Sequence, residues 1–142
     1  MSPAFRWPLR VYYEDTDAGG VVFYANYLKF MERARTEWLR ELGFEQQRLM
    51  EAQGVMFAVR SAQLDYLRPA ILDDALTITS QVVDQRRASL RIHHEVWRGS
   101  EGDAPELLCR GEVKIACLDA RQFTPRPIPD NLAALMHAGD PQ

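Results

Sequence analysis

The feature that most constrains the fold is one long amphipathic segment, residues 24–42. Its apolar side chains recur at steps of three and four, the spacing that places side chains on one face of an α-helix. These apolar side chains are Tyr27, Met31, Ala34, Trp38 and Leu42. Gly43 follows the last of them, where a left-handed C-terminal cap is favoured. We therefore predict a helix over Tyr24–Leu42 that buries one stripe and exposes the other.

Strand patterns lie on both sides of this helix. Phe5–Tyr13 has strand character, and Pro8 within it favours an edge position or a bulge. A short helical turn is expected over Glu45–Ala52, and Asn131–Ala138 is expected to add one or two more turns. The remaining strand-like segments are Val55–Leu67, Ala75–Val83, Ser89–Trp97 and Leu107–Leu118. One helix with about five antiparallel strands favours an α+β fold, a curved sheet wrapped around the helix.

Length and charge exclude several classes of protein. The 142 residues, 46% of them hydrophobic, fit a single domain over residues 1–142 that buries a core without metal or disulfide staples. The net charge of −3 argues against a nucleic-acid partner, because such binding needs a basic field. The N-terminus lacks a signal-peptide pattern and no apolar run is long enough to span a membrane, so a cytoplasmic location is expected.

The cysteines and histidines predict neither a disulfide nor a metal site. Cys109 and Cys117 lie on one predicted strand about 26 Å apart, too far for a disulfide, and are expected to be buried free thiols. His93 and His94 are neighbours on a strand and therefore face opposite ways, so they cannot chelate one metal.

The segment that carries chemistry is the polar loop between the first strand and the helix. Asp15 and Asp17 come first, the glycine pair Gly19–Gly20 follows, and a short apolar run leads into the helix. This order puts a carboxylate beside the unpaired N–H groups of a helix N-terminus. Those groups can bind a carbonyl oxygen while the carboxylate attacks the carbonyl carbon or activates water. The loop therefore predicts acyl-transfer hydrolysis.

Two other interpretations of this loop are open. Asp15 and Asp17 can be solvated turn residues or helix caps. With Gly20 they also match three positions of a calcium-binding EF-hand loop. Asn26, however, stands where that loop needs a bidentate glutamate, which argues against calcium.

A longer set of residues carries a resemblance to a known family. The set comprises Phe5–Pro8, residues 11–27, Phe30–Glu37, Val59-Arg60, Tyr66–Ala70 and Pro125–Pro129. Over nearly its whole length the chain resembles the 4-hydroxybenzoyl-CoA thioesterase family, and most closely its branch of Tol-Pal-system-associated acyl-CoA thioesterases. The resemblance implies a hot-dog fold, a homodimer or homotetramer with active sites at subunit interfaces, and no cofactor, since coenzyme A is part of the substrate.

The resemblance also implies roles for residues of the loop. The family's catalytic aspartate falls on Asp17, as general base or nucleophile, and the backbone amide around Tyr24 would bind the thioester oxygen. The nearby substrate-binding candidates are Gly20, Val21, Asn26 and Tyr27. Many members of the Tol-Pal branch carry histidine where this chain has Tyr24, whereas hydroxybenzoyl-CoA enzymes can carry tyrosine there.

Basic residues offer a site for the phosphates of coenzyme A. Arg86 and Arg87 lie at a predicted turn, followed by Ser89, and guanidinium groups suit phosphate oxygens. Two solvated turn arginines are the alternative. Glu32 and Arg35, three apart on the helix, can pair across one turn, and a solvated face or an oligomer contact is expected for them.

Three functions follow in order of support. The first is hydrolysis of a short-chain or aromatic acyl-CoA, or of an acyl carrier protein thioester, to free acid and thiol. The second, a hot-dog dehydratase or hydratase, needs a histidine near the acid, and none lies between Asp17 and the helix. The third is a non-catalytic acyl-CoA or acyl carrier protein binding module linked to the Tol-Pal envelope system, which would bind without releasing thiol.

Overall fold

The computed structural model describes residues 4–99 and 104–138. Its elements, in chain order, are β1 (Phe5–Arg10), the 3-10 turn η1 (Tyr13–Asp15), α1 (Asn26–Glu41), α2 (Gln46–Gln53), β2 (Val55–Tyr66), β3 (Ala75–Gln85), β4 (Ser89–Arg98), β5 (Glu106–Asp119) and α3 (Asp130–Ala138).

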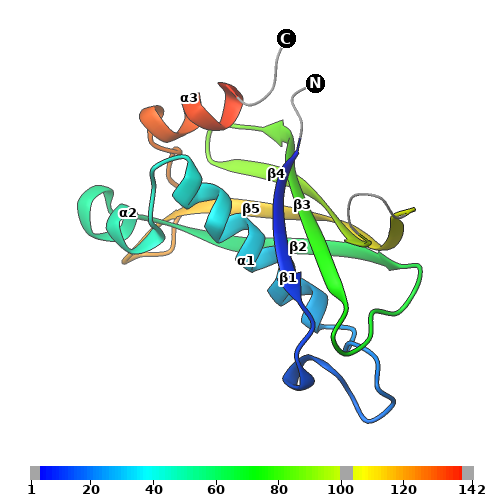
Figure 1. The fold of residues 1–142 in the computed structure, drawn as a ribbon. Coiled ribbons are helices and arrows are strands. Elements are labelled where there is room, and N and C mark those ends of the chain that lie inside the picture. Colours follow the sequence, from blue (N-terminus) through cyan, green and yellow to red (C-terminus); the bar gives the residue numbers. More distant parts are fainter. Residues whose placement is uncertain (1–3, 100–103, 139–142) are drawn as a thin grey trace.

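The strands form one five-stranded sheet in the order β1-β3-β4-β5-β2, and every neighbouring pair is antiparallel. Helix α1 lies along one face of this curved sheet, and α2 and α3 lie toward one end of the molecule (Figure 1). The predicted α+β architecture, a long helix wrapped by about five strands, is confirmed. Pro8 lies in β1 at the edge of the sheet, where a residue without an N–H is tolerated.

The core forms where the apolar stripe of α1 meets the sheet. Phe30, Met31 and Ala34 of α1 are fully enclosed and pack with Leu76 and Ile78 of β3. Burial of a side chain as large as Phe30 or Met31 contributes on the order of 1.5–3 kcal/mol. The alternation predicted for β3 holds at Leu76 and Ile78, which face α1. These contacts hold the start of α1 against the sheet and so position the loop before it.

Several element boundaries differ from the sequence prediction. The first strand ends at Arg10, because the chain then turns through η1 instead of extending to Tyr13. Helix α1 begins at Asn26, two residues later than predicted, because Ala25 is its N-cap. The C-terminal helix has nine residues, Asp130–Ala138. The late start of α1 leaves Tyr24 in the loop before the helix.

The cysteines agree with the prediction of free buried thiols. Cys109 and Cys117 are both enclosed and unbridged. Burial raises the pKa of the Cys109 thiol to about 12, with a further contribution from Asp65. Within residues 4–99 and 104–138, no helix is long and apolar enough to cross a membrane.

Candidate functional site

The loop between η1 and α1 folds back on itself in a hairpin-like turn, residues 16–22, called here the Asp17 turn. Thr16 and Val22 form an antiparallel bridge, and the Asp17 amide donates to the Val21 carbonyl (2.9 Å). Val21 bridges to Ile71, which ties the turn to the segment before β3. Gly20 has a φ of 83°, a conformation that favours glycine. The glycine at this position is therefore required by the turn itself.

Asp15 anchors the base of this loop, in what is called here the Asp15–Asn26 junction. Its carboxylate is buried and accepts hydrogen bonds from the Tyr12 amide and from the side-chain amide of Asn26, both at 2.8 Å. The interpretation of Asp15 as a solvated turn residue is therefore wrong. Asn26, predicted to bind substrate, is itself buried and holds Asp15. The junction fixes the start of α1 relative to η1.

Asp17, two residues later, has the opposite environment. Its side chain is exposed, and Oδ1 accepts a hydrogen bond from the Gly19 amide (2.8 Å). Its Oδ2 forms no hydrogen bond with any residue that the structure describes. One oxygen thus orients the carboxylate and the other is free to take a proton or to attack a carbon atom.

The backbone amides around the start of α1 differ in whether they have an acceptor. The Asn26 amide donates to the Phe23 carbonyl (2.8 Å) and the Leu28 amide to the Ala25 carbonyl (3.1 Å). The Tyr24 amide has no acceptor among residues 4–99 and 104–138. Such a donor at the positive end of a helix suits a developing oxyanion. The Tyr24 carbonyl, in contrast, is occupied, because it accepts from the Tyr66 hydroxyl (2.9 Å).

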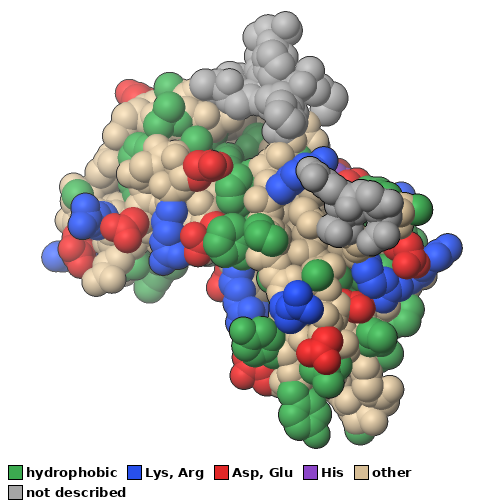
Figure 2. Space-filling view, in the orientation of Figure 1, with side chains coloured by type: hydrophobic (Ala, Val, Ile, Leu, Met, Phe, Trp, Pro, Cys, Tyr) green, Lys and Arg blue, Asp and Glu red, His purple; other side chains and the backbone are tan. Residues whose placement is uncertain are grey.

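An exposed aromatic surface surrounds Tyr24. Tyr24 is 64% exposed, and its ring contacts that of Phe23 (ring centroids 4.8 Å apart) and, edge to face, that of Tyr66 (6.3 Å). Tyr27, by contrast, is buried, and its hydroxyl accepts from the Ala70 amide (3.1 Å). Hydrophobic side chains also reach the surface at the end of the molecule that carries η1 (Figure 2). This end therefore offers apolar contact area beside the Asp17 turn.

The basic candidates lie at the other end of the sheet. Arg86 follows the end of β3, where its amide donates to the Ser89 carbonyl (2.8 Å) and its side chain pairs with Asp84 (3.2 Å). The Asp17 turn adjoins the start of β3, at the opposite end of the strand from Arg86 (Figure 1). The length of β3 alone therefore separates the Asp17 turn from Arg86 by about 33 Å. Arg87 lies in the same turn. One copy of the chain does not bring these residues to Asp17.

One buried polar network, formed by Arg35 and His94, was missed from the sequence. Arg35, expected on a solvated helix face, is buried, and its Nη1 donates to His94 Nε2 (3.0 Å). The Nδ1 of His94 contacts the Thr79 carbonyl (2.9 Å) and Ser80 Oγ (3.1 Å). Burial and the Arg35 charge lower the pKa of His94 to about 3, so this histidine is neutral.

The chain is similar in sequence to known thioesterases. The sequence profile of the thioesterase superfamily matches residues 19–104. The chain is 42% identical over 137 residues to the acyl-CoA thioesterase YbgC of Haemophilus influenzae, a match that covers 96% of this chain and 97% of that protein. It is 45% identical over 130 residues to the acyl-CoA thioester hydrolase YbgC of Escherichia coli, with 92% and 93% covered.

A solved structure extends the likeness to the fold. A variant 4-hydroxybenzoyl-CoA thioesterase complexed with 4-hydroxybenzoyl-CoA superposes with a TM-score of 0.86 at 21% identity, covering 94% of this chain and 98% of that one. At this level of identity the likeness concerns the fold alone. The predicted hot-dog fold is confirmed.

Proposed function

The chain belongs to the thioesterase superfamily, as its sequence predicted, and we propose that it hydrolyses the thioester of an acyl-CoA with Asp17 as the reacting carboxylate. The products are a carboxylic acid and coenzyme A. The observation that carries the proposal is the free Oδ2 of an exposed, oriented Asp17 on the same loop as the unpaired Tyr24 amide. A carboxylate and an oxyanion donor are the two parts that thioester hydrolysis needs.

Two chemical routes use these groups. In the first, Asp17 takes a proton from water as the water oxygen attacks the thioester carbon, and the thiolate leaves. In the second, the carboxylate attacks that carbon and expels the thiolate, forming a mixed anhydride that water then hydrolyses. In both routes negative charge builds on the carbonyl oxygen, which the Tyr24 amide stabilises. Thiolate departs readily because a free thiol has a pKa of about 8.5.

The complete site is proposed to need two copies of the chain. Arg86, Arg87 and Ser89 lie far from Asp17 in one copy, so they would bind the coenzyme A phosphates of a substrate held by a partner's Asp17 turn. The edge strand β2 supports such pairing, because Val59 and Tyr66 expose large apolar side chains along it. An acyl carrier protein thioester as donor, and a link to the Tol-Pal envelope system, are further parts of this proposal.

The test is thiol release from a panel of acyl-CoA substrates, short-chain and aromatic, by the purified chain. We expect release of one thiol per acid formed, with a clear preference within the panel. Acyl-CoA binding without thiol release would instead favour the non-catalytic binding module. Sedimentation of the same sample measures the oligomeric state, for which a dimer or tetramer is expected.

A further inference from the structure

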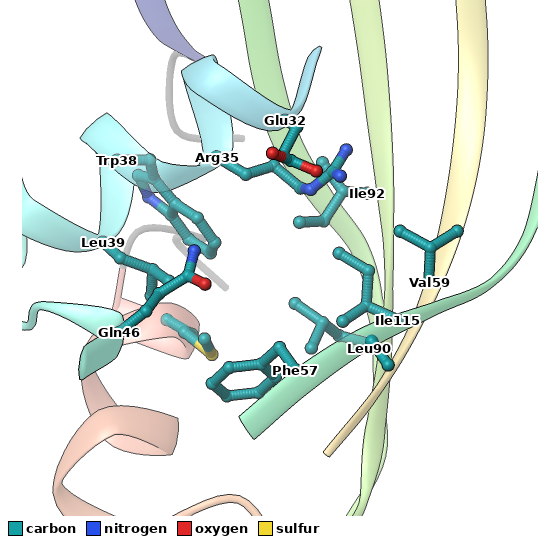
Figure 3. Close-up of a pocket in the computed structure, with 12 residues that line it drawn as sticks. Glu32, Arg35, Trp38, Leu39, Gln46, Phe57, Val59, Leu90, Ile92 and Ile115 are labelled. Carbon is teal, nitrogen blue, oxygen red and sulfur yellow. The ribbon is translucent and has the colours of Figure 1, made fainter. Parts of the chain in front are cut away.

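A hollow lies between α1 and the sheet, and no residue of the Asp17 turn lines it. It is a pocket of about 210 Å³ that opens between α1, α2 and β2 (Figure 3). Its walls are mostly apolar and include Trp38, Leu39, Phe57, Val59, Ile92 and Ile115. An apolar cavity of about 150 Å³ can hold benzene, so this pocket has room for one ring or a chain of about six carbons.

One cation stands at the edge of this apolar space. Arg35 is only 8% exposed, and its one hydrogen-bonded side-chain partner is the neutral His94. It forms no ion pair with any carboxylate in the described part of the chain. Figure 3 shows its guanidinium at the rim of the pocket. Burial lowers the pKa of Arg35, and the nearby charge of Glu32 offsets this only in part. A buried guanidinium without a hydrogen-bonded carboxylate is costly, since its donors lose water without gaining an anion in direct contact.

The geometry points to an organic carboxylate as the missing partner. We propose that this pocket binds a small carboxylate whose anionic group pairs with Arg35 and whose hydrocarbon part lies against Ile92, Ile115 and Phe57. Arginine and carboxylate match in a planar, two-bond arrangement, and the apolar walls exclude competing water. A neutral ligand of the same shape would leave the guanidinium unpaired, so the site discriminates by charge.

Glu32 is the other charged group that lines the pocket. It is exposed, one turn before Arg35 on α1, and its charge opposes a bound anion. Its removal should therefore strengthen carboxylate binding, whereas loss of Arg35 should weaken it. The two side chains thus give opposite and separable effects.

Free acid and substrate are both sources of such a carboxylate. One is the acid released by hydrolysis, and the other is a second carboxylate carried at the end of an acyl group. Both sources rest on the proposed function, but binding of a free carboxylate to the pocket is measured without any hydrolysis.

The first experiment measures binding of hexanoate and benzoate, with hexanamide and benzamide as neutral controls. Calorimetry gives the affinities, and the fluorescence of Trp38, which lines the pocket, reports occupancy; Trp38→Phe removes that signal. We expect each carboxylate to bind at least tenfold more tightly than its amide. Equal affinities for acid and amide would overturn the proposal, whether or not the protein releases thiol from acyl-CoA.

Variants locate the binding. Arg35→Met should weaken hexanoate binding at least tenfold, and Glu32→Gln should strengthen it about threefold to tenfold. Arg33→Gln, at an exposed neighbouring arginine, is the matched control and should change nothing. If Arg35→Met does not fold, the exposed Glu32 still decides the matter, since unchanged hexanoate affinity in Glu32→Gln contradicts the proposal.

A last comparison separates the two sources. If the substrate supplies the carboxylate, kcat/KM should be higher for adipyl-CoA than for hexanoyl-CoA. The variant Arg35→Lys should then reduce this preference. If the released acid supplies the carboxylate, free hexanoate should inhibit hydrolysis. The variant Glu32→Gln should then strengthen this inhibition. Absence of both effects, in a protein that does release thiol, would contradict both sources; the affinities for acid and amide would still decide whether the pocket binds a carboxylate.

Discussion

Asp15 and Asp17 are two residues apart, yet their surroundings differ completely. At the Asp15–Asn26 junction a buried carboxylate accepts two hydrogen bonds and has both oxygens occupied. In the Asp17 turn an exposed carboxylate accepts one and leaves Oδ2 free. A buried, satisfied acid contributes to stability, whereas an exposed, oriented acid can react. The two regions should therefore respond oppositely to the loss of their carboxylates.

The largest expected effect comes from the Asp17 turn. Asp17→Asn keeps the oxygen that accepts from Gly19 but removes the charge, so kcat for thiol release should fall about 100-fold or more. The free energy of unfolding should stay within about 0.5 kcal/mol of the original, because the site is exposed. Steady-state thiol release and urea denaturation measure the two quantities. Undiminished kcat would remove Asp17 from the reaction.

The Asp15–Asn26 junction should show the reverse. Asp15→Ala leaves the buried amide of Asn26 without its acceptor, at a cost of about 1–3 kcal/mol in the free energy of unfolding. Urea denaturation measures this loss. The remaining folded protein should keep kcat within a fewfold of the original. A stable but inactive Asp15→Ala variant would contradict the division of roles between the two acids.

His94 is also buried and polar, and it should affect stability rather than activity, in a way that depends on pH. The pKa of His94 is lowered to about 3 in the folded chain, whereas in the unfolded chain it is about 6.5. The unfolded state therefore binds the extra proton between these values, and stability falls as pH drops below about 6.5. Between pH 7 and 5 this loss amounts to about 2 kcal/mol. In His94→Gln the dependence of unfolding free energy on pH should be flatter by about that amount.

Arg86 and Arg87, at the far end of the sheet, are exposed like Asp17, and their loss should likewise affect activity rather than stability. The double change Arg86→Gln and Arg87→Gln should raise KM for acyl-CoA about threefold to tenfold, because phosphate contacts are lost, with kcat nearly unchanged. Steady-state kinetics on acyl-CoA and on a short acyl-pantetheine thioester separate the causes. An equal rise in KM for the thioester that lacks the nucleotide would contradict phosphate binding.

The smallest effect is expected at Tyr24. Its proposed contribution is the backbone amide, so Tyr24→Phe should change kcat by less than about twofold, whereas a proline there would remove the donor. Thiol-release kinetics on the phenylalanine variant measure this. A large loss of kcat would assign a role to the phenol hydroxyl.

The fold followed from the sequence because its signals are local and periodic. The apolar face of α1 and the alternating burial in β3 both depend on side chains a few residues apart. Each pattern repeats several times, so it is recognisable in the sequence. The exact ends were less predictable. Ala25 forms the N-cap without a capping side chain, so nothing in the sequence marks the helix start at Asn26.

The candidate site was only partly predictable for the same reason. The Asp17 turn is contiguous, and its glycines mark it. The contact between Asp15 and Asn26 joins residues eleven apart, and that between Arg35 and His94 joins residues 59 apart, so no local pattern announces either. Arg35 does lie four residues after Met31 and four before Leu39, both buried, and this spacing was the available signal.

The most direct test is a crystal structure of Asp17→Asn bound to an acyl-CoA that the original protein hydrolyses. We expect the thioester carbonyl oxygen to lie within hydrogen-bonding distance of the Tyr24 amide, and the carbonyl carbon to lie beside the side chain of residue 17. A thioester seated elsewhere, with residue 17 in bulk solvent and the Tyr24 amide unoccupied, would contradict it.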